Sequence, residues 1–289
     1  MAEARSGELT IYYQTEGDPS GLPLLLVAGL GAQLTVWPAG LRSALADRGF
    51  FVISYDNRDA GKSAWLDDLG PVDLLAVLGG GVPPPYLLSD MAADGVAVLD
   101  ALSLPSAHVL GASMGGMIAQ ALAIGYPSRV RSLTSFMSTT GESSVGQPRH
   151  HVAEMMLTPR PPDKAAAVER GVQMARVISS PAFGFDEEAT RALTSAEFDR
   201  AYHPDGVGRQ LAAILLSGDR TAALRGLSMP VLVIHGDADP MVDVSGGHAT
   251  AAAIPDSRLW VIPGLGHDIP AELFGELADA IAVLAKQAE

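Results

Sequence analysis

The sequence predicts an α/β fold in which a mostly parallel central sheet carries helices on both faces and a helical insertion covers the carboxyl ends of the strands. Two observations predict the sheet: short apolar runs end in glycine or an acidic residue, and helical patterns lie between them. Strands that are apolar along their whole length are typical of a parallel sheet buried on both faces. A third observation predicts the insertion, because this alternation stops between Ser138 and Leu227.

The first predicted strand differs from the later ones. Residues Glu8–Gly17 alternate between apolar and polar side chains, which predicts an antiparallel edge strand or hairpin. Six later runs predict buried parallel strands. They are Leu22–Gly29, Phe50–Asp56, Ala107–Gly111, Val130–Phe136, Pro230–Gly236 and Leu259–Pro263. Apolar residues recur at helical spacing in the stretches Trp37–Arg48, Leu88–Ala101, Ser113–Tyr126, Gly246–Ile254 and Ala271–Lys286.

The middle of the chain has helical patterns and no run typical of a strand. These patterns are Lys164–Ser179, Glu187–Tyr202 and Asp205–Leu216. We therefore expect a core domain formed by residues 1–137 and 228–289, with a helical cap domain formed by residues 138–227.

The composition excludes several classes of function. A net charge of −14 disfavours binding to nucleic acid or to an anionic membrane surface. The chain has no cysteine, so disulfides, thiolate metal sites and cysteine nucleophiles are excluded. The first residues lack the apolar segment of a signal peptide, and the apolar runs are too short to span a bilayer. We therefore expect a cytoplasmic protein; the sequence does not predict its oligomeric state.

Residues 107–117 contain the pattern Gly-x-Ser-x-Gly centred on Ser113. An apolar run precedes the pattern and a helical stretch follows it, which is the strand–turn–helix setting of a nucleophile elbow. In such a turn the serine backbone is strained, and the two glycines leave space where side chains would collide. The pattern predicts that the Ser113 hydroxyl projects beyond the strand end. Taken alone, it also fits an ordinary Gly/Ser turn.

Acidic residues and a histidine follow two later strands. Asp237 and Asp239 come directly after the run that begins at Pro230, and His267 follows the run that begins at Leu259. The carboxyl ends of parallel strands meet at one edge of the sheet, where ligands bind in open α/β folds. The chain order of serine, acid and histidine is that of one hydrolase architecture, which favours catalysis over a chance turn.

The chain resembles the α/β-hydrolase superfamily over nearly all of its length. Four segments carry the resemblance: the Gly-Ala-Ser-Met-Gly-Gly elbow, His-Gly-Asp-Ala-Asp-Pro at 235–240, Pro-Gly-Leu-Gly-His at 263–267, and Asp-Asn-Arg-Asp-Ala-Gly-Lys-Ser at 56–63. Within the superfamily, Asp-x-Arg-Asp-x-Gly, the Met after the serine and the stretch Ser217-Gly-Asp-Arg-Thr-Ala222 are similar to capped bacterial esterases of the aclacinomycin methylesterase type.

The resemblance and the chemistry together imply a role for each residue. Ser113 would be the nucleophile, His267 the base that accepts its proton, and Asp239 the acid that orients the imidazole. The backbone N–H groups of Leu30 and Met114 would form the oxyanion hole for the tetrahedral intermediate.

Other candidate residues have weaker support. Asp237 is the alternative acid, and its other interpretation is a brace for the turn. His150 and His151 are adjacent and point apart, and no acidic partner has ligand spacing, so no metal site is predicted. The segment 29–34 lacks the third glycine of a dinucleotide fingerprint, so no cofactor is predicted.

The expected function is hydrolysis of a small-molecule carboxylic ester through an acyl-enzyme, and the esterase resemblance points to methyl esters of bulky aromatic or polyketide-like compounds. The same triad supports alternatives: hydrolysis of a C–C bond or a lactone, perhydrolysis, or ester cleavage coupled to decarboxylation. A non-catalytic binding protein with this fold is a third class, which the complete set of serine, acid and histidine disfavours.

Overall fold

The computed structural model describes residues 2–80 and 82–288, and within them one sheet of eight strands runs in the order β1-β2-β4-β3-β5-β6-β7-β8. The strands are β1 (Ala2–Ser6), β2 (Leu9–Glu16), β3 (Leu22–Val27), β4 (Phe50–Tyr55), β5 (Ala107–Ala112), β6 (Val130–Phe136), β7 (Val231–Gly236) and β8 (Arg258–Ile262). The β1–β2 and β2–β4 pairs are antiparallel, and the other pairs are parallel. The mostly parallel sheet with an antiparallel edge hairpin is therefore confirmed.

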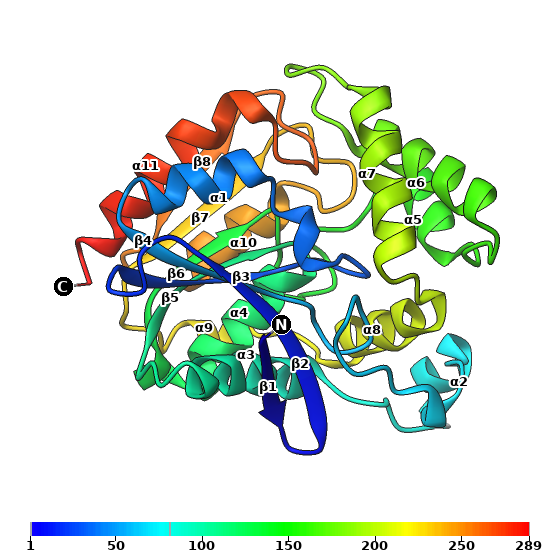
Figure 1. Ribbon diagram of the computed structural model, residues 1–289, viewed down its shortest axis with the longest axis horizontal. Coiled ribbons are helices and arrows are strands. Elements are labelled where there is room, and N and C mark those ends of the chain that lie inside the picture. The colour runs from blue at the N-terminus through cyan, green and yellow to red at the C-terminus, as the bar shows by residue number, and fades with distance from the viewer. Residues whose placement is uncertain (1, 81, 289) are drawn as a thin grey trace.

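Helices cover both faces of this sheet (Figure 1). The α-helices are α1 (Ala39–Ala46), α2 (Leu74–Leu78), α3 (Leu88–Ala101), α4 (Met114–Gly125), α5 (His150–Leu157), α6 (Lys164–Ile178), α7 (Glu187–Arg200), α8 (Pro204–Leu216), α9 (Thr221–Leu224), α10 (Ser245–Ala253) and α11 (Phe274–Ala285). Short 3-10 turns are η1 (Leu34–Val36), η2 (Asp67–Leu69), η3 (Pro127–Arg129) and η4 (Ala271–Leu273).

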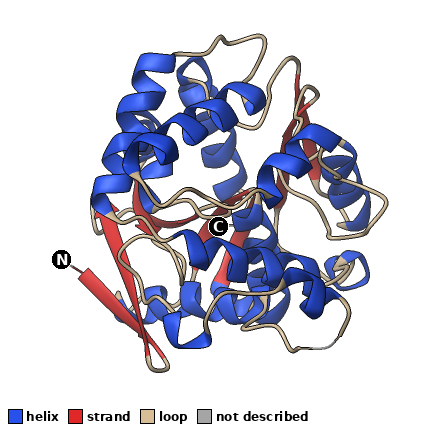
Figure 2. Cartoon of the chain, turned by 90° about the vertical axis from the view of Figure 1, so that its right-hand side faces the viewer, coloured by secondary structure: helices blue, strands red, loops and turns tan. Residues whose placement is uncertain are grey.

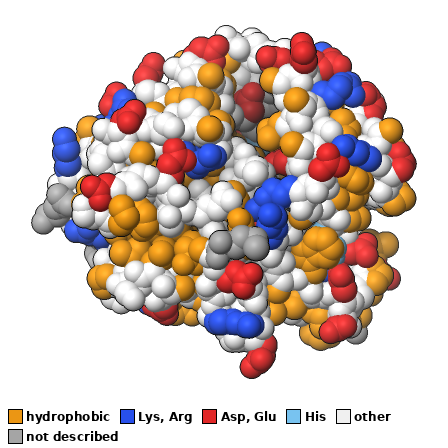
Figure 3. Space-filling model, in the orientation of Figure 1, with side chains coloured by type: hydrophobic (Ala, Val, Ile, Leu, Met, Phe, Trp, Pro, Cys, Tyr) orange, Lys and Arg blue, Asp and Glu red, His pale blue; other side chains and the backbone are white. Residues whose placement is uncertain are grey.

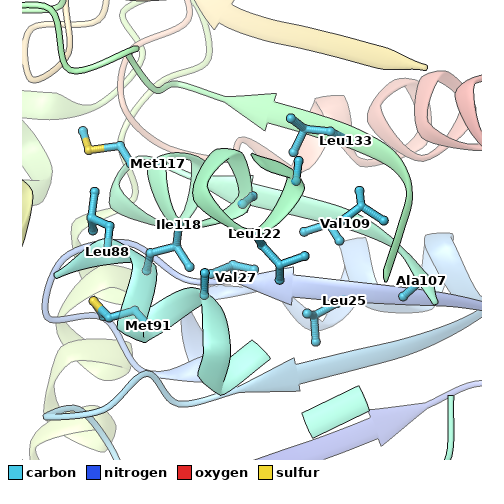
Figure 4. Packing of buried hydrophobic residues seen from close by; sticks show 14 of the residues in the cluster. Leu25, Val27, Leu88, Met91, Ala107, Val109, Met117, Ile118, Leu122 and Leu133 are labelled. Atoms are coloured by element: carbon cyan, nitrogen blue, oxygen red, sulfur yellow. The ribbon is translucent and has the colours of Figure 1, made fainter. Parts of the chain in front are cut away.

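Successive side chains of the inner strands point to opposite faces and build two separate cores. In β3, Leu25 and Val27 pack in one core with residues of α3 and α4 (Figure 4). Leu24 and Leu26 pack in the other core, beneath α1 and α11. Burial on both faces explains why β3 is apolar at almost every position, and it fixes the strand ends where the functional side chains lie.

Helices α5 to α8 form a separate group, which we call the helical layer, in the chain between β6 and β7. Figure 2 views the molecule from the side of these helices and shows helices in front of the strand ends. The short helix α9 instead packs on α4 and α10, and Leu224 of α9 belongs to the core that α3 and α4 cover.

One strand and three α-helices were not expected from the sequence: β1, α2, α5 and α9. The β1 residues are short or polar, and the strand forms because it pairs along its whole length with β2, from Ala2 opposite Tyr13 to Ser6 opposite Leu9.

Acidic and basic side chains are interspersed over the face seen in Figure 3, and this face has no continuous basic area.

Candidate active site

Ser113 occupies the single residue between β5 and α4, and its backbone has φ 58° and ψ −124°. A non-glycine residue with positive φ is strained and persists only where its surroundings impose it. The Ser113 N–H donates to the Phe136 carbonyl at 2.9 Å, and the Ser138 hydroxyl donates to the Ser113 carbonyl at 2.8 Å. Phe136, the last residue of β6, and Ser138, two residues later, therefore hold the turn in place.

The glycines of this turn are required by close packing of backbone. A methyl group at Gly111 would lie 2.1 Å from the Gly115 carbonyl oxygen, and one at Gly115 would lie 1.9 Å from the Val27 carbonyl oxygen. Neither site can accept a Cβ atom without movement of the backbone. The helix therefore starts directly against the end of β3, which places the loop after β3 beside the serine.

His267 and Asp239 are joined by a hydrogen bond of 2.7 Å from Nδ1 to Oδ2. Asp239 follows β7 and is buried, and its other oxygen accepts the N–H groups of Met241 at 2.8 Å and Val242 at 2.9 Å. Because Nδ1 donates to the carboxylate, Nε2 of a neutral His267 is the nitrogen that can accept a proton.

The electrostatics of this pair favour a charged carboxylate. Burial alone would raise the pKa of Asp239. The charge of His267 and hydrogen bonds from His235, His267 and the Val242 N–H outweigh burial and hold this pKa well below its ordinary value. Asp239 is therefore ionised at neutral pH and can stabilise an imidazolium at His267.

Asp237, the alternative acid, lies elsewhere. Its side chain is exposed, and Oδ1 accepts the Gly264 N–H at 2.6 Å. The carboxylate thus braces the turn after β8. The geometry brings Asp239, and not Asp237, to the imidazole of His267.

The Ser113 hydroxyl has no hydrogen bond to His267 in this structure, nor to any other described residue. A methyl group at Gly29 would lie 3.7 Å from Ser113 Oγ, so the hydroxyl faces the loop after β3. Hydrogen bonds between catalytic groups often tighten only when substrate is bound.

Two backbone N–H groups beside Ser113, those of Leu30 and Met114, make no hydrogen bond to a described residue. In the same loop, the Gly31 N–H donates to the Gln210 side chain at 2.7 Å, and the Ala32 N–H donates to the Gly29 carbonyl at 3.2 Å. The Leu30 and Met114 donors therefore remain available to a ligand.

Side chains that sequence reasoning missed hold this loop. Gln210 of α8 accepts the Gly31 N–H and donates to the Arg58 carbonyl at 2.7 Å. Asn57 donates to the Ala28 carbonyl at 2.9 Å. No local pattern identifies Gln210, because its partners lie 179 and 152 residues away in the chain.

The helical layer also contacts the histidine turn. The His267 N–H donates to the Ile178 carbonyl at 2.7 Å, and the Gly266 N–H donates to the Ser180 hydroxyl at 2.8 Å. The Ser180 hydroxyl in turn donates to Asp268. Burial raises the pKa of Asp268 despite these hydrogen bonds. A cavity of about 270 Å³ between α6, α7 and Asp268 opens beside this turn.

Among the described residues, no three His, Cys, Asp or Glu side chains are arranged to hold a metal ion. His150 and His151 are exposed, and His150 lies 3.6 Å from Glu154 one helical turn away. Within the same residues, every helix is too short or too polar to cross a membrane.

Comparison with known proteins agrees with the resemblance expected from the sequence. Residues 23–272 match the family described as alpha/beta hydrolase fold. Rhodomycin D methylesterase DauP of Streptomyces sp. (strain C5) is 32% identical, with 95% of this chain and 94% of the relative covered. Rhodomycin D methylesterase DnrP of Streptomyces peucetius is 30% identical with the same coverage.

A solved structure gives the same result for the fold. The meta-cleavage product hydrolase from Pseudomonas fluorescens IP01 has a TM-score of 0.78 at 19% identity, covering 100% of this chain and 98% of that one. The predicted α/β-hydrolase fold and the resemblance to bacterial methylesterases are therefore confirmed. The chain belongs to the alpha/beta hydrolase family.

Proposed function

We propose that this protein hydrolyses small-molecule carboxylic esters through an acyl-serine intermediate. One observation carries the proposal: a buried, ionised Asp239 holds His267 at 2.7 Å, at the same sheet edge as a strained serine turn with free backbone N–H groups beside it. Strain at a turn and a carboxylate oriented toward a histidine are features of nucleophilic catalysis.

Ser113, His267 and Asp239 are the proposed catalytic triad. His267 Nε2 accepts the hydroxyl proton as Ser113 Oγ attacks the ester carbonyl carbon, and Asp239 stabilises the imidazolium. The proton then passes from His267 to the leaving alkoxide, which departs as an alcohol. Water, deprotonated by His267, attacks the acyl-enzyme and releases the carboxylic acid.

The Leu30 and Met114 N–H groups are the proposed oxyanion hole. Neither donor has a hydrogen-bond partner among the described residues, and the two come from the segments that meet beside Ser113. The Met114 N–H is at the amino end of α4, where the helix dipole also favours negative charge. Loss of one such donor typically costs about 3 kcal/mol of barrier.

We further propose that residues 138–227 form a cap whose helical layer selects the substrate. Hydrogen bonds from the layer to the loop after β3 and to the His267 turn support this role. The two relatives, both rhodomycin D methylesterases, support methyl esters as substrates. Bulky aromatic or polyketide-like methyl esters are the class proposed here. A cytoplasmic location fits a chain without cysteine, which needs no oxidising compartment to fold.

Labelling with a fluorophosphonate probe tests the proposed nucleophile. The native protein is expected to react and Ser113→Ala is not, with kcat on a methyl or nitrophenyl ester reduced by about 10⁵-fold or more. Alanine at the same backbone angles keeps the fold, which circular dichroism would verify. A folded native protein that resists labelling contradicts the proposal. Labelling combined with turnover of diketones or peroxide alone assigns the triad to a different reaction.

A further inference from the structure

Arg160 is a cationic side chain in the segment between α5 and α6. It makes no hydrogen bond or ion pair with any described residue. The segment itself is held by others: Arg170 donates to the Met155 and Thr158 carbonyls at 2.6 and 2.7 Å, and Tyr202 donates to the Pro161 carbonyl at 2.7 Å. Arg160 is therefore not needed to close this turn.

The guanidinium of Arg160 lies against the loop of the proposed oxyanion hole. A methyl group at Gly31 would lie 3.0 Å from Arg160 Nη2 and 2.9 Å from Val207 Cγ2. Two residues earlier, Gly29 faces Ser113 Oγ. The Cα atoms of Gly29 and Gly31 are two peptide units apart and so at most about 7.6 Å from each other. The guanidinium of Arg160 and the hydroxyl of Ser113 therefore border the same short stretch of backbone.

The Arg160 side chain can be reached from solvent. Its surface is accessible to solvent, yet protein surrounds the side chain closely enough that desolvation lowers its pKa. A guanidinium nevertheless stays charged at neutral pH. An anionic ligand can therefore approach the charged guanidinium from solvent.

Other arginines that join the layer to the core are neutralised by carboxylates. Arg200 pairs with Asp56 at 2.7 Å, and Arg209 pairs with Asp59 at 2.8 Å. Glu197 is the carboxylate whose charge affects the pKa of Arg160. It accepts the Thr35 hydroxyl at 2.9 Å and forms no ion pair with Arg160. Among the described residues, no carboxylate pairs with Arg160, so its positive charge is available to a ligand.

We propose that Arg160 binds an anionic group of the substrate, a carboxylate or an ionised phenol, close to the scissile ester. This inference rests on the proposed ester hydrolysis at Ser113. A guanidinium binds a carboxylate through two parallel N–H···O hydrogen bonds, which fixes orientation as well as charge. The enzyme thus prefers esters that carry a second, acidic function.

Matched ester pairs test the preference. Each pair joins 4-nitrophenol to acyl chains of equal length that end in methyl or in carboxylate, such as pentanoate and hydrogen glutarate, with the succinate and adipate pairs alongside. The quantity measured is kcat/KM of the anionic ester divided by that of the neutral one. In Arg160→Gln, this ratio is expected to fall by 10- to 100-fold at the preferred length, while kcat/KM for the neutral ester changes less than about 3-fold.

Two variants serve as controls. Arg160→Lys keeps the charge but loses the planar fork, so it retains part of the ratio. Arg191→Gln removes a half-buried arginine of α7 that pairs with Glu187 and Glu169, and leaves the ratio unchanged. The ratio in the native protein also falls with added salt, because the recognition is electrostatic.

The outcomes separate the two proposals. A ratio unchanged in Arg160→Gln at every chain length overturns the inference, and so does an equal loss on both esters, which indicates a structural role. Both results leave ester hydrolysis intact. A native protein that hydrolyses neither ester and resists the fluorophosphonate contradicts the proposed function, and the inference falls with it.

Discussion

Strands β4, β5 and β7 of the central sheet bury every residue, whereas helix α7 of the helical layer buries none. Helix α6 buries only Ala167, Val168 and Val172 of its fifteen residues. Helix α8 is the exception within the layer, because it buries Leu211, Ala212 and Ala213. Apolar burial of about 25 cal/mol per Å² therefore acts mainly in the sheet and, within the layer, mainly in α8.

Polar contacts also join the layer to the core, in addition to the apolar packing of Ala213 and Ile214 of α8. Arg209 is fully buried and makes two hydrogen bonds to Asp59, at 2.8 and 2.9 Å. Arg200 pairs with Asp56, whose other oxygen accepts the Leu34 N–H. Such contacts are directional, so they set the position of the layer over the loop after β3.

The central sheet and the helical layer therefore have different roles. Close packing in the sheet fixes the proposed triad, because strand ends in a dense core do not shift independently. The layer meets the site through a few side chains, among them Gln210 and the unpaired Arg160. We therefore expect substitutions in the sheet to affect catalysis and stability strongly, and substitutions in the layer to affect substrate choice.

The largest expected effect is on the proposed triad. In Asp239→Asn, the amide would donate to His267 Nδ1 and force the proton onto Nε2, which could then no longer accept the Ser113 proton. We expect kcat to fall by about 10⁴-fold, as loss of the correct tautomer does in serine hydrolases generally. Steady-state kinetics with a nitrophenyl ester would measure the loss.

Asp237→Asn is the matched control, two residues away. Its amide oxygen can still accept the Gly264 N–H, so we expect kcat to change less than about 3-fold. A greater loss in Asp237→Asn than in Asp239→Asn would show that the acid has been assigned to the wrong residue.

The second effect tests the dense packing of the core. A methyl group at Gly115 would lie 1.9 Å from the Val27 carbonyl oxygen, so β3 and α4 would have to separate. We expect Gly115→Ala to lower the free energy of unfolding by more than about 3 kcal/mol. Urea denaturation would measure the change, and a loss below 1 kcal/mol would contradict the rigid packing described for this turn.

The buried strands were predictable because burial on both faces leaves a one-dimensional pattern. The run Leu22–Gly29 predicted β3 (Leu22–Val27), and Ala107–Gly111 predicted β5 (Ala107–Ala112). Strand β1 lacks this pattern, because the strand is formed by pairing with β2 and does not depend on burial of its side chains. The side chains proposed for catalysis stand at ends of such strands, so their order could be read from the sequence.

Contacts between the layer and the core could not be predicted in the same way. Gln210 reaches Gly31 across 179 residues, and no periodicity in α8 distinguishes it from its neighbours. The choice between Asp237 and Asp239 had the same difficulty, since both follow β7. Only the three-dimensional arrangement shows which carboxylate faces His267.

The third effect concerns a histidine buried in the core. His108 of β5 donates to or accepts from the Ser132 hydroxyl at 2.8 Å. Desolvation, with a smaller effect from the charge of Arg131, lowers the pKa of His108 to about 4 from 6.5. As pH falls, the unfolded chain takes up this proton at a higher pH than the folded chain does. The unfolding free energy that neutral His108 contributes is therefore fully present above pH 6.5 and is lost as the pH falls toward 4.

For the native protein, this titration removes about 2 kcal/mol of unfolding free energy between pH 7 and pH 5. His108→Gln is expected to reduce the pH-dependent loss by that amount, whatever its stability at pH 7. His248→Gln, at an exposed position of α10, is the control and keeps the native pH dependence. Equal pH slopes in all three proteins would contradict a buried neutral His108.

The smallest effect tests the tolerance of the layer. A methyl group at Gly208, inside α8, would meet no atom within 4 Å. Alanine also restricts the unfolded chain and favours the helix, so Gly208→Ala is expected to stabilise α8 by about 0.5–1 kcal/mol. Gly208→Ala and Gly115→Ala make the same chemical change. Their effects on stability are expected to differ because Gly208 has open space beside it and Gly115 is packed against β3.

The measurement for Gly208→Ala also shows how tightly the two regions are coupled. If the buried pair Arg209–Asp59 makes the layer and sheet unfold together, the variant raises the global Tm by about 1–3 °C. If the layer opens by itself, hydrogen exchange slows in the α8 amides while the global Tm stays constant. Because both outcomes stabilise α8, a faster exchange or a lower Tm would contradict the open surroundings of Gly208 and the distinction between a dense sheet and a tolerant layer.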